Sequence, residues 1–378
     1  MFLRAALVSI PALACSACGT GEPRIGYVES SLAEDGSLHL VTIWRTGQAE
    51  GGNWHGSELL YAHGQDGSYD VKSQAIAEAE RDVAFEARYE LAFDGDGHPL
   101  IVSEVEAKLT VYSPGDGEWK VLPKNPTLSA DALAAMDQPE NLGSVWTAED
   151  GSVKVLYGQF IYTIQDDQIA AAQDIGQPCA MEELCYFSST GSMTGQAARW
   201  DHDLGFHLWT LDCSAGAGSC AWTDVGAMAG GDLGGSSMST HRTFFHTADG
   251  TAVLVRIVRP DGANDHTVVA STMSGETVLS SSDIFRVGGG PLANGGFAAA
   301  ALGYDKQLHL AVVGAGGEVQ NIDLGEIELG EEPIGVHARP TESGEEVHVV
   351  LRESNTSAAH FTVSLPGGQF TKESIDMQ

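Results

Sequence analysis

The stretch "YELAFDGDGHPLIVSEVEAKLTVYSPGDGEWKVL", residues 89–122, holds four short apolar segments separated by turn sequences. The first strand is followed by a turn over 94–97 and by a second strand over 99–105. A third strand over 108–112 and a fourth over 119–122 flank the turn sequence "SPGDG". Glycine supplies the positive φ that tight hairpins need, and aspartate tolerates the same backbone region. The stretch therefore predicts a four-stranded antiparallel unit.

Turns of the same kind recur along the chain, flanked by apolar alternating segments. In chain order they fall at Gly36, Gly97, Gly151, Leu204 with Gly205, Gly250, Lys306 and Gly344. The intervals are roughly 40 to 60 residues and average near fifty, which is the spacing expected of propeller blades. The sequence thus predicts repeated sheets of one design.

A lone four-stranded sheet with two apolar faces cannot bury both of them. Copies placed radially, face against face, bury every face and leave only short outer edges. The predicted fold is therefore all-β, a single β-propeller over residues 25–378 with seven four-stranded blades. Six or eight blades stay open as alternatives, because the turns at 205 and 306 are degenerate.

The composition suits a large packed core and an acidic exterior. The chain has 378 residues, of which 43% are hydrophobic, and 46 are glycine. There are 19 Lys and Arg against 52 Asp and Glu, a formal net charge of −33. Such a surface repels phosphate backbones, so nucleic acid is excluded as a partner, and it attracts cations diffusely.

The chain opens with "MFLRAALVSIPALACSACGT", in which an arginine precedes a short apolar run and then small residues around two cysteines. Ten apolar residues are too few to span a bilayer but suit the core of a secretory signal. Residues 1–18 are therefore predicted to be a signal peptide and 19–24 a short tether. No later apolar stretch approaches the length of a transmembrane helix.

The end of this segment resembles the lipobox of bacterial lipoproteins, in which the cysteine after the cleavage site carries the lipid. Cys18, between Ala17 and Gly19, fits the small-residue part of that motif, and Cys15 is the competitor. Neither has the usual leucine three residues earlier. The resemblance implies a lipoprotein of the bacterial outer membrane or cell surface, whose only membrane contact is the lipid. A plainly secreted or periplasmic protein and a cytosolic one remain alternatives.

Four further cysteines form two close pairs, Cys179 with Cys185 and Cys213 with Cys220. The second pair brackets "SAGAGS" between two predicted strands, where a disulfide would pin the hairpin in an oxidising compartment. The alternative is a zinc site. The spacings lack the Cys-x-x-Cys pattern of structural zinc, and no pair of histidines completes either set, so disulfides are predicted.

Several second strands read as Asp-Gly followed by His and a hydrophobic residue, as in "DGSLHL" at 35–40. This pattern resembles bacterial propellers built from sialidase-like (BNR-type) blades, which implies the fold and no activity. The recurrent histidines are predicted to be structural at one fixed position of each blade rather than a metal site: His39, His207, His309 and His348. His98 is shifted by one position and is expected to face the other way.

Longer inserts separate the predicted strands. Residues 75–87 and 129–136 are predicted to form short helices, and 226–240 and 286–296 to form glycine-rich loops. Inserts of this kind tend to gather on one face, where propellers usually bind.

Familiar catalytic and phosphate-binding motifs are absent from the sequence. There is no Gly-x-Ser-x-Gly elbow and no His-Glu-x-x-His helix, and Gly288 to Gly290 lack a following Lys-Ser/Thr. The sequence "DGDGH" at 94–98 begins like a calcium loop, but Pro99 and the apolar run after it break the ligand alternation. It is interpreted as a hairpin turn, and no cofactor or metal is assigned.

The sequence favours a non-catalytic, surface-anchored propeller, predicted to be a monomer, that binds a protein, peptide or glycan. Its rival is an extracellular polysaccharide hydrolase or lyase with carboxylates at the central funnel, since glycosidases need two facing carboxylates. A sialidase would need the Ser-x-Asp-x-Gly-x-x-Trp box, which is missing. A component of a membrane assembly is the third alternative.

Overall fold

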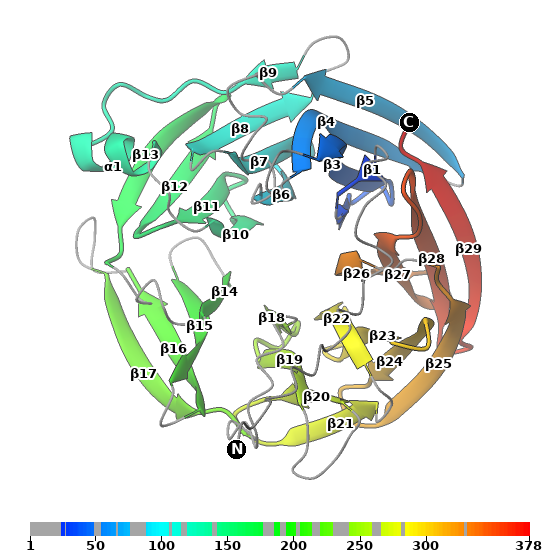
Figure 1. The fold of residues 1–378 in the computed structure, drawn as a ribbon. Helices are drawn as coiled ribbons and strands as arrows, with labels where there is room; N and C mark the ends of the chain where they lie inside the picture. Colours follow the sequence, from blue (N-terminus) through cyan, green and yellow to red (C-terminus); the bar gives the residue numbers. More distant parts are fainter. Residues whose placement is uncertain are drawn as a thin grey trace, which may run out of the picture.

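The structure is a computed structural model that describes residues 24–26, 28–48, 54–65, 67–75, 88–105, 108–114, 119–137, 142–176, 185–189, 194–201, 205–213, 220–229, 242–258, 266–280, 284–328 and 331–378. Seven antiparallel sheets stand around a central axis, so the chain is a seven-bladed β-propeller as predicted (Figure 1). Each sheet is one blade and is made from one continuous part of the chain.

The first four blades occupy the N-terminal part of the chain. Blade 1 contains β1 (Arg24–Ile25), β2 (Glu29–Leu32), β3 (Leu38–Gln48), β4 (Trp54–Gln65) and β5 (Ser68–Ala75). Blade 2 contains β6 (Arg88–Phe93), β7 (Pro99–Val105), β8 (Lys108–Pro114) and β9 (Trp119–Val121). Blade 3 contains β10 (Leu142–Thr147), β11 (Val153–Tyr157), β12 (Phe160–Gln165) and β13 (Gln168–Asp174). Blade 4 contains β14 (Cys185–Ser189), β15 (Thr194–Asp201), β16 (Gly205–Asp212) and β17 (Ala221–Ala227).

Three blades and one helix complete the described part of the chain. Blade 5 contains β18 (Arg242–His246), β19 (Ala252–Val258), β20 (Thr267–Ser271) and β21 (Glu276–Ser280). Blade 6 contains β22 (Ile284–Pro291), β23 (Phe297–Gly303), β24 (Gln307–Val313) and β25 (Val319–Glu326). Blade 7 contains β26 (Glu331–Thr341), β27 (Gly344–Arg352), β28 (Ser357–Leu365) and β29 (Gln369–Asp376). The helix α1 (Ala130–Ala135) confirms the helix predicted over 129–136, and Ser129 caps it.

The strand order explains where the apolar residues lie. Second and third strands lie between neighbouring blades, so most of their side chains on both faces are apolar. The strands β11 and β23 are buried along their whole length. Fourth strands form the outer rim and alternate between exposed and buried side chains, as β25 does. The core is therefore a series of apolar layers between blades rather than one central cluster.

One five-residue turn closes the first hairpin of blades 1, 2, 3, 5 and 6. Its fourth residue is a glycine with φ between 79° and 90°, whose N–H donates to the carbonyl of the first residue. These glycines are Gly36, Gly97, Gly151, Gly250 and Gly295. The positive φ is the reason why glycine recurs at this point of the sequence.

The turns at Gly205 and Lys306 do not belong to this set. They join the second and third strands of blades 4 and 6, so the prediction that all seven turns are of the same kind is wrong, although the blade count is right. The first hairpin of blade 6 lies at residues 292–296 instead. The predicted loop over 286–296 is therefore also wrong, since Gly288, Gly289 and Gly290 lie within β22. They are glycines because a Cβ at Gly288 or Gly290 would meet the backbone of β26.

The recurrent histidines occupy two different strands, which corrects the single fixed position predicted for them. His39 and His348 lie in second strands (β3 and β27), whereas His207 and His309 lie in third strands (β16 and β24). The last two are equivalent to each other, because each faces an aspartate of the fourth strand, Asp224 or Asp323.

The ring closes between blade 7 and blade 1 without exchange of a strand. The backbone N–H of Ile25 donates to the carbonyl of Asn355 at 2.8 Å, and Leu40, Val350 and Met377 share one buried cluster. Side chains rather than a shared sheet therefore hold the first and last blades together.

Some predicted features fall outside the described residues. These are the signal peptide 1–18 with Cys15 and Cys18, the tether up to Pro23, Cys179 and the side chain of Cys185, the helix predicted over 75–87 beyond Ala75, and residues 230–240 of the second predicted loop. Gly226 and Ala227 of that loop belong to β17. In the described part of the chain, no helix has the length and hydrophobicity needed to cross a bilayer.

Candidate functional site

A large cleft opens where the first-hairpin turns of blades 1, 2 and 3 meet. Its volume is about 1120 Å³, which exceeds the usual size of a small-molecule pocket. The turn between the third and fourth strands of blade 3, with Asp166 and Asp167, completes the wall. We call this cavity the acidic cleft, because eight of its lining residues carry carboxylates: Glu34, Asp35, Asp94, Asp96, Glu149, Asp150, Asp166 and Asp167.

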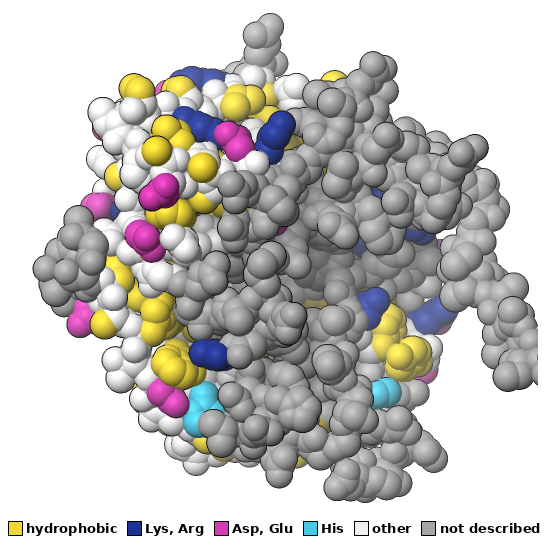
Figure 2. Space-filling model, turned by 60° about the vertical axis from the view of Figure 1, so that its left-hand side comes forward, with side chains coloured by type: hydrophobic (Ala, Val, Ile, Leu, Met, Phe, Trp, Pro, Cys, Tyr) yellow, Lys and Arg dark blue, Asp and Glu magenta, His cyan; other side chains and the backbone are white. Residues whose placement is uncertain are grey.

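Among the described residues that line the acidic cleft, none is a lysine or an arginine. On the described part of the face in Figure 2, the acidic side chains are dispersed among hydrophobic and uncharged ones. Carboxylates gathered on the walls of a cleft focus their field into it and raise the local concentration of cations. The cleft is therefore a site of concentrated negative charge in an already acidic protein.

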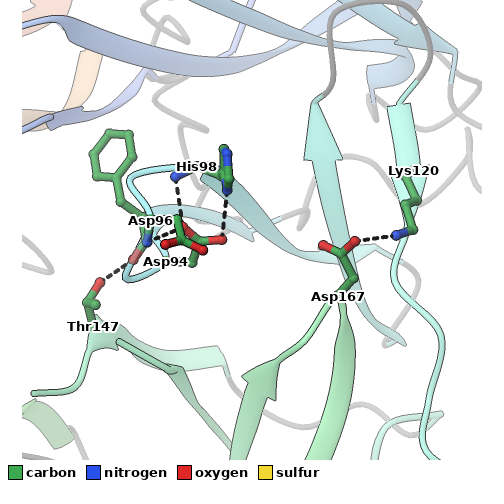
Figure 3. A network of polar contacts seen from close by, with 7 residues as sticks. Asp94, Asp96, His98, Lys120, Thr147 and Asp167 are labelled. Atoms are coloured by element: carbon green, nitrogen blue, oxygen red, sulfur yellow. Dashed lines mark hydrogen bonds and ion pairs between the residues drawn. The ribbon is translucent and has the colours of Figure 1, made fainter. Parts of the chain in front are cut away.

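The turn of blade 2 differs from its counterparts in how it uses aspartate. In blades 1, 3 and 5 the aspartate at the third position, such as Asp35, accepts the N–H of the fifth residue. In blade 2 the first residue, Asp94, takes over this role and accepts the N–H groups of Asp96 and His98 at 2.9 and 2.8 Å (Figure 3). The third residue, Asp96, is exposed and is not needed to hold the turn.

Asp94, Asp96 and His98 can place one ligand atom each within 4.8 Å of one another. They are the one group of this kind among the described residues. The interpretation of 94–98 as a hairpin turn is confirmed. The same residues have the donor types that bind a divalent cation, although His98 already contacts Asp94 at 3.3 Å.

Two glycines bring the turns of blades 2 and 3 into direct contact. The N–H of Gly95 donates to the carbonyl of Gly151 at 2.7 Å. A Cβ added to Gly95 would lie 2.6 Å from the Cα of Gly151, so no side chain fits there. The hydroxyl of Thr147 also donates to the carbonyl of Phe93 across the same junction. The floor of the acidic cleft is thus a fixed backbone contact between two blades.

The last two carboxylates lie on a two-residue hairpin turn between β12 and β13. Asp166 and Asp167 have φ of 50° and 56°, in the left-handed region that such a turn requires and that aspartate tolerates. Two of the three described non-glycine residues with positive φ therefore lie in the acidic cleft. Asp167 also accepts a hydrogen bond from Lys120 at 2.7 Å.

The acidic cleft keeps its charge well below neutral pH. Hydrogen bonds from Ser37 lower the pKa of Asp35, hydrogen bonds from Ser152 lower that of Asp150, and the bond from Lys120 lowers that of Asp167. Burial, helped by the neighbouring His63, lowers the pKa of His39 to about 4. His39 is therefore neutral at pH 7 and does not offset the carboxylates.

Apolar side chains lie beside the carboxylates in the acidic cleft. Leu32, Phe93, Leu100, Leu122 and Ile164 all contribute to its lining. A ligand that suits this surface carries positive charge together with hydrocarbon, as lysine and arginine side chains do.

The residues singled out from the sequence are not brought together. His39 and His98 reach the acidic cleft or its turn, whereas His207 pairs with Asp224 at 3.0 Å in blade 4 and His348 contacts His360 at 2.9 Å in blade 7. The four recurrent histidines thus form no common metal site. The predicted disulfide between Cys213 and Cys220 is confirmed and lies in blade 4.

A second acidic feature lies on the inner strands of blades 1 and 2. Burial raises the pKa of Glu29 on β2 well above its ordinary value, and the like charge of Glu90 on β6 adds to the shift. Two carboxyls whose environments shift their pKa values apart are a common arrangement in acid–base catalysis. Neither Glu29 nor Glu90 stands out in the sequence.

Comparison with known proteins adds little beyond the fold. No protein-family model and no curated protein matches the chain. Among solved structures it is similar to virginiamycin B lyase from Staphylococcus aureus, with 12% identity, a TM-score of 0.48 and coverage of 88% of this chain and 93% of that one. It is also similar to AofleA from Arthrobotrys oligospora, with 10% identity, a TM-score of 0.48 and coverage of 93% and 86%. For the Aleuria aurantia lectin the values are 9%, 0.46, 93% and 95%.

The chain is thus defined as a β-propeller with an acidic cleft at the turns of three blades. The structural neighbours also include a prolyl oligopeptidase from Galerina marginata, with 10% identity and a TM-score of 0.45. A shared fold carries no function with it, so the function has to be argued from the residues of this chain.

Proposed function

We propose that the protein is a non-catalytic binding propeller whose acidic cleft holds a basic segment of a partner protein or peptide. The proposal rests on one observation: the described residues that line a cleft of about 1120 Å³ include eight carboxylates and no lysine or arginine. A lysine- and arginine-rich segment would pair its charges with the turn carboxylates and lay its hydrocarbon stems on Phe93 and Ile164. An uncharged glycan gains nothing from this charge, so it becomes the less favoured ligand.

The position of the carboxylates supports a role in binding rather than in folding alone. Asp96 is exposed, and Asp94 in its place accepts the backbone N–H groups that hold the turn. Asp166 lies at a turn position of positive φ that glycine or asparagine would also suit, so the turn does not require its carboxylate.

We further propose that the protein acts outside the cytoplasm, anchored through a lipid on Cys18 or, failing that, on Cys15. The disulfide between Cys213 and Cys220 supports an oxidising compartment. Such an anchor would hold the propeller near its membrane while the acidic cleft takes up a soluble or surface-bound basic partner.

Fluorescence anisotropy with a labelled octalysine peptide tests the proposed ligand class. We expect saturable binding that weakens with added salt, because the attraction is electrostatic. A double variant, Asp96→Asn with Asp166→Asn, removes two charges from the cleft with nearly isosteric side chains that tolerate both backbone conformations. It should weaken binding by about fivefold to tenfold.

The matched control is Glu326→Gln with Glu328→Gln, which removes the same charge from exposed positions of blade 6. It should change the dissociation constant less than about twofold, because surface charges this remote are screened. Equal effects of the two double variants, or the absence of saturable binding at low salt, would contradict the proposal.

A polysaccharide hydrolase or lyase is the second candidate, and Glu29 is the residue that favours it. A protonated Glu29 beside Glu90 could donate a proton while its neighbour acts as a base. Turnover of labelled polysaccharides that is lost in Glu29→Gln would support this candidate, and no turnover by the wild-type protein would exclude it for the substrates tried.

A further inference from the structure

The third strands differ on the face that each blade turns toward the preceding one, and in blades 1, 5 and 6 this face holds no aromatic side chain among the described residues. On the face that each blade turns toward the preceding one, the third strands of four blades carry an aromatic side chain. These are Tyr112 of blade 2, Tyr162 of blade 3, Trp209 of blade 4 and Phe361 of blade 7. Each ring packs into the apolar layer that separates its blade from the preceding one.

Blade 6 presents Ala311 at this position. The match with blade 4 follows from the two equivalent histidines, because Trp209 lies two residues after His207 and Ala311 two residues after His309. The partner on the second strand is alanine in both blades, since Ala197 pairs with Trp209 and Ala299 pairs with Ala311. Blade 6 therefore lacks the ring without a larger neighbour in compensation.

A hollow of about 510 Å³ lies where the ring is missing, between blades 5 and 6. Val268 and Leu279 of blade 5 line one side, and Ala299, Ala301 and Ala311 of blade 6 line the other. The hollow opens to solvent at the outer rim, and its volume falls within the range of small-molecule sites.

Polar groups stand at one edge of the hollow. His309 and Asn321 both contribute to its lining, and Asp323 lies 4.0 Å from Nδ1 of His309. Val278, of which 58% is exposed, marks the side on which the hollow meets solvent at the outer rim. An apolar cavity with a few convergent polar groups is the usual form of a ligand site.

We propose that this hollow binds a small neutral aromatic molecule, whose ring takes the place that Trp209 occupies in blade 4. The ring would contact the alanines of β23 and β24, and a polar substituent would hydrogen-bond to His309 or Asn321. An anionic ligand is disfavoured by Asp323 and by the net charge of −33. The site is separate from the acidic cleft, which lies between blades 1, 2 and 3, so it does not depend on the proposed function.

The test uses N-phenyl-1-naphthylamine, a neutral aromatic dye whose fluorescence rises in apolar surroundings. The wild-type protein should bind it saturably with about one molecule per chain. Ala311→Phe restores the ring found in blade 7 and fills the hollow, so it should weaken binding at least about tenfold. Ala311→Ser keeps the hollow open at the same position and should bind nearly as the wild type does.

Two further measurements keep the outcome decisive. If Ala311→Phe does not fold, Ala299→Val serves in its place. Its larger side chain fills part of the hollow, so it should also weaken dye binding, by less than the tenfold expected of Ala311→Phe. Octalysine should not displace the dye, because its site is the acidic cleft. No saturable dye binding to the wild type, or equal binding by Ala311→Phe and Ala311→Ser, would overturn the proposal.

Discussion

At the scale of single residues, glycine decides how the turns of the acidic cleft meet. Gly151 has a φ of 79°, and a Cβ on it would lie 2.9 Å from the Cα of Gly95. Gly250 occupies the same turn position in blade 5 with a φ of 83°, and a Cβ there would meet nothing within 4 Å. The two glycines thus share one conformational requirement and differ only in their surroundings.

Gly151→Ala should therefore destabilise the protein more than Gly250→Ala does. Both variants lose the left-handed conformation that glycine adopts freely, at about 1 kcal/mol each. Only Gly151→Ala also pushes blade 2 away from blade 3, which should add at least about 1 kcal/mol. Urea denaturation measures both values, and equal losses would mean that the close approach of Gly95 and Gly151 does not constrain the fold.

At the scale of elements, one contact at the outer rim joins blades 3 and 4. The indole N–H of Trp222 on β17 donates to the carbonyl of Ile175, just beyond β13, at 3.1 Å. The disulfide between Cys213 and Cys220 closes the hairpin that leads into β17. It packs in one apolar cluster with Trp146 and Trp222, so it helps to fix the contact between blades 3 and 4.

Replacement of Cys213 and Cys220 by serine should lower the unfolding free energy by about 2 kcal/mol, because a short closed loop is released in the unfolded chain. Thermal unfolding followed by tryptophan fluorescence measures the loss. Dithiothreitol should lower the melting temperature of the wild-type protein by about as many degrees as the double substitution does. If dithiothreitol lowers the melting temperature of the double variant further, the predicted bridge between Cys179 and Cys185 is present. A double variant that melts at the same temperature as the wild-type protein would contradict the role assigned to the bridge between Cys213 and Cys220.

At the scale of the whole molecule, the ring depends on a histidine cluster between blades 7 and 1. His337 contacts the hydroxyl of Ser30 at 2.8 Å, and His360 contacts both His348 and Tyr69, at 2.9 and 3.1 Å. Burial lowers the pKa of His337 to about 4 and that of His348 to about 3, helped in each by the neighbouring His360. Burial also lowers the pKa of His360, although Glu373 opposes that shift.

The closure between blades 7 and 1 should weaken as the pH falls. The folded-state pKa values lie below the unfolded value of about 6.5, so the unfolded chain binds more protons and stability is complete only above that pH. Between pH 6.5 and 4.5 each buried histidine should cost up to about 2 kcal/mol of unfolding free energy.

Urea denaturation across this pH range measures the slope, and His348→Asn should reduce it. His98→Asn, which changes an exposed histidine, should leave the slope as it is in the wild type. A slope that is the same in all three proteins would show that the cluster does not control closure.

The sequence alone determined the repeated unit and much of its detail. The strands of blade 2, the turn glycines Gly36, Gly97, Gly151 and Gly250, the helix at 129–136 and the bridge of Cys213 with Cys220 could all be predicted. Their signals are local, because turn conformation, capping and pairing across a short hairpin depend on neighbours in the chain. The blade count followed from the physical need of a two-faced sheet for neighbours on both sides.

Only the tertiary structure decided which hairpin each turn belongs to and which side chains meet. Gly205 and Lys306 resemble first-hairpin turns in sequence, but strand order places them in second hairpins. The acidic cleft joins Asp35, Asp96 and Asp166 from three blades, and the hollow depends on Ala311 facing blade 5. Acids are so frequent in this chain that none stands out in sequence, and a missing ring is visible only beside its equivalents. Both sites arise from packing between blades, which spacing along the chain does not encode.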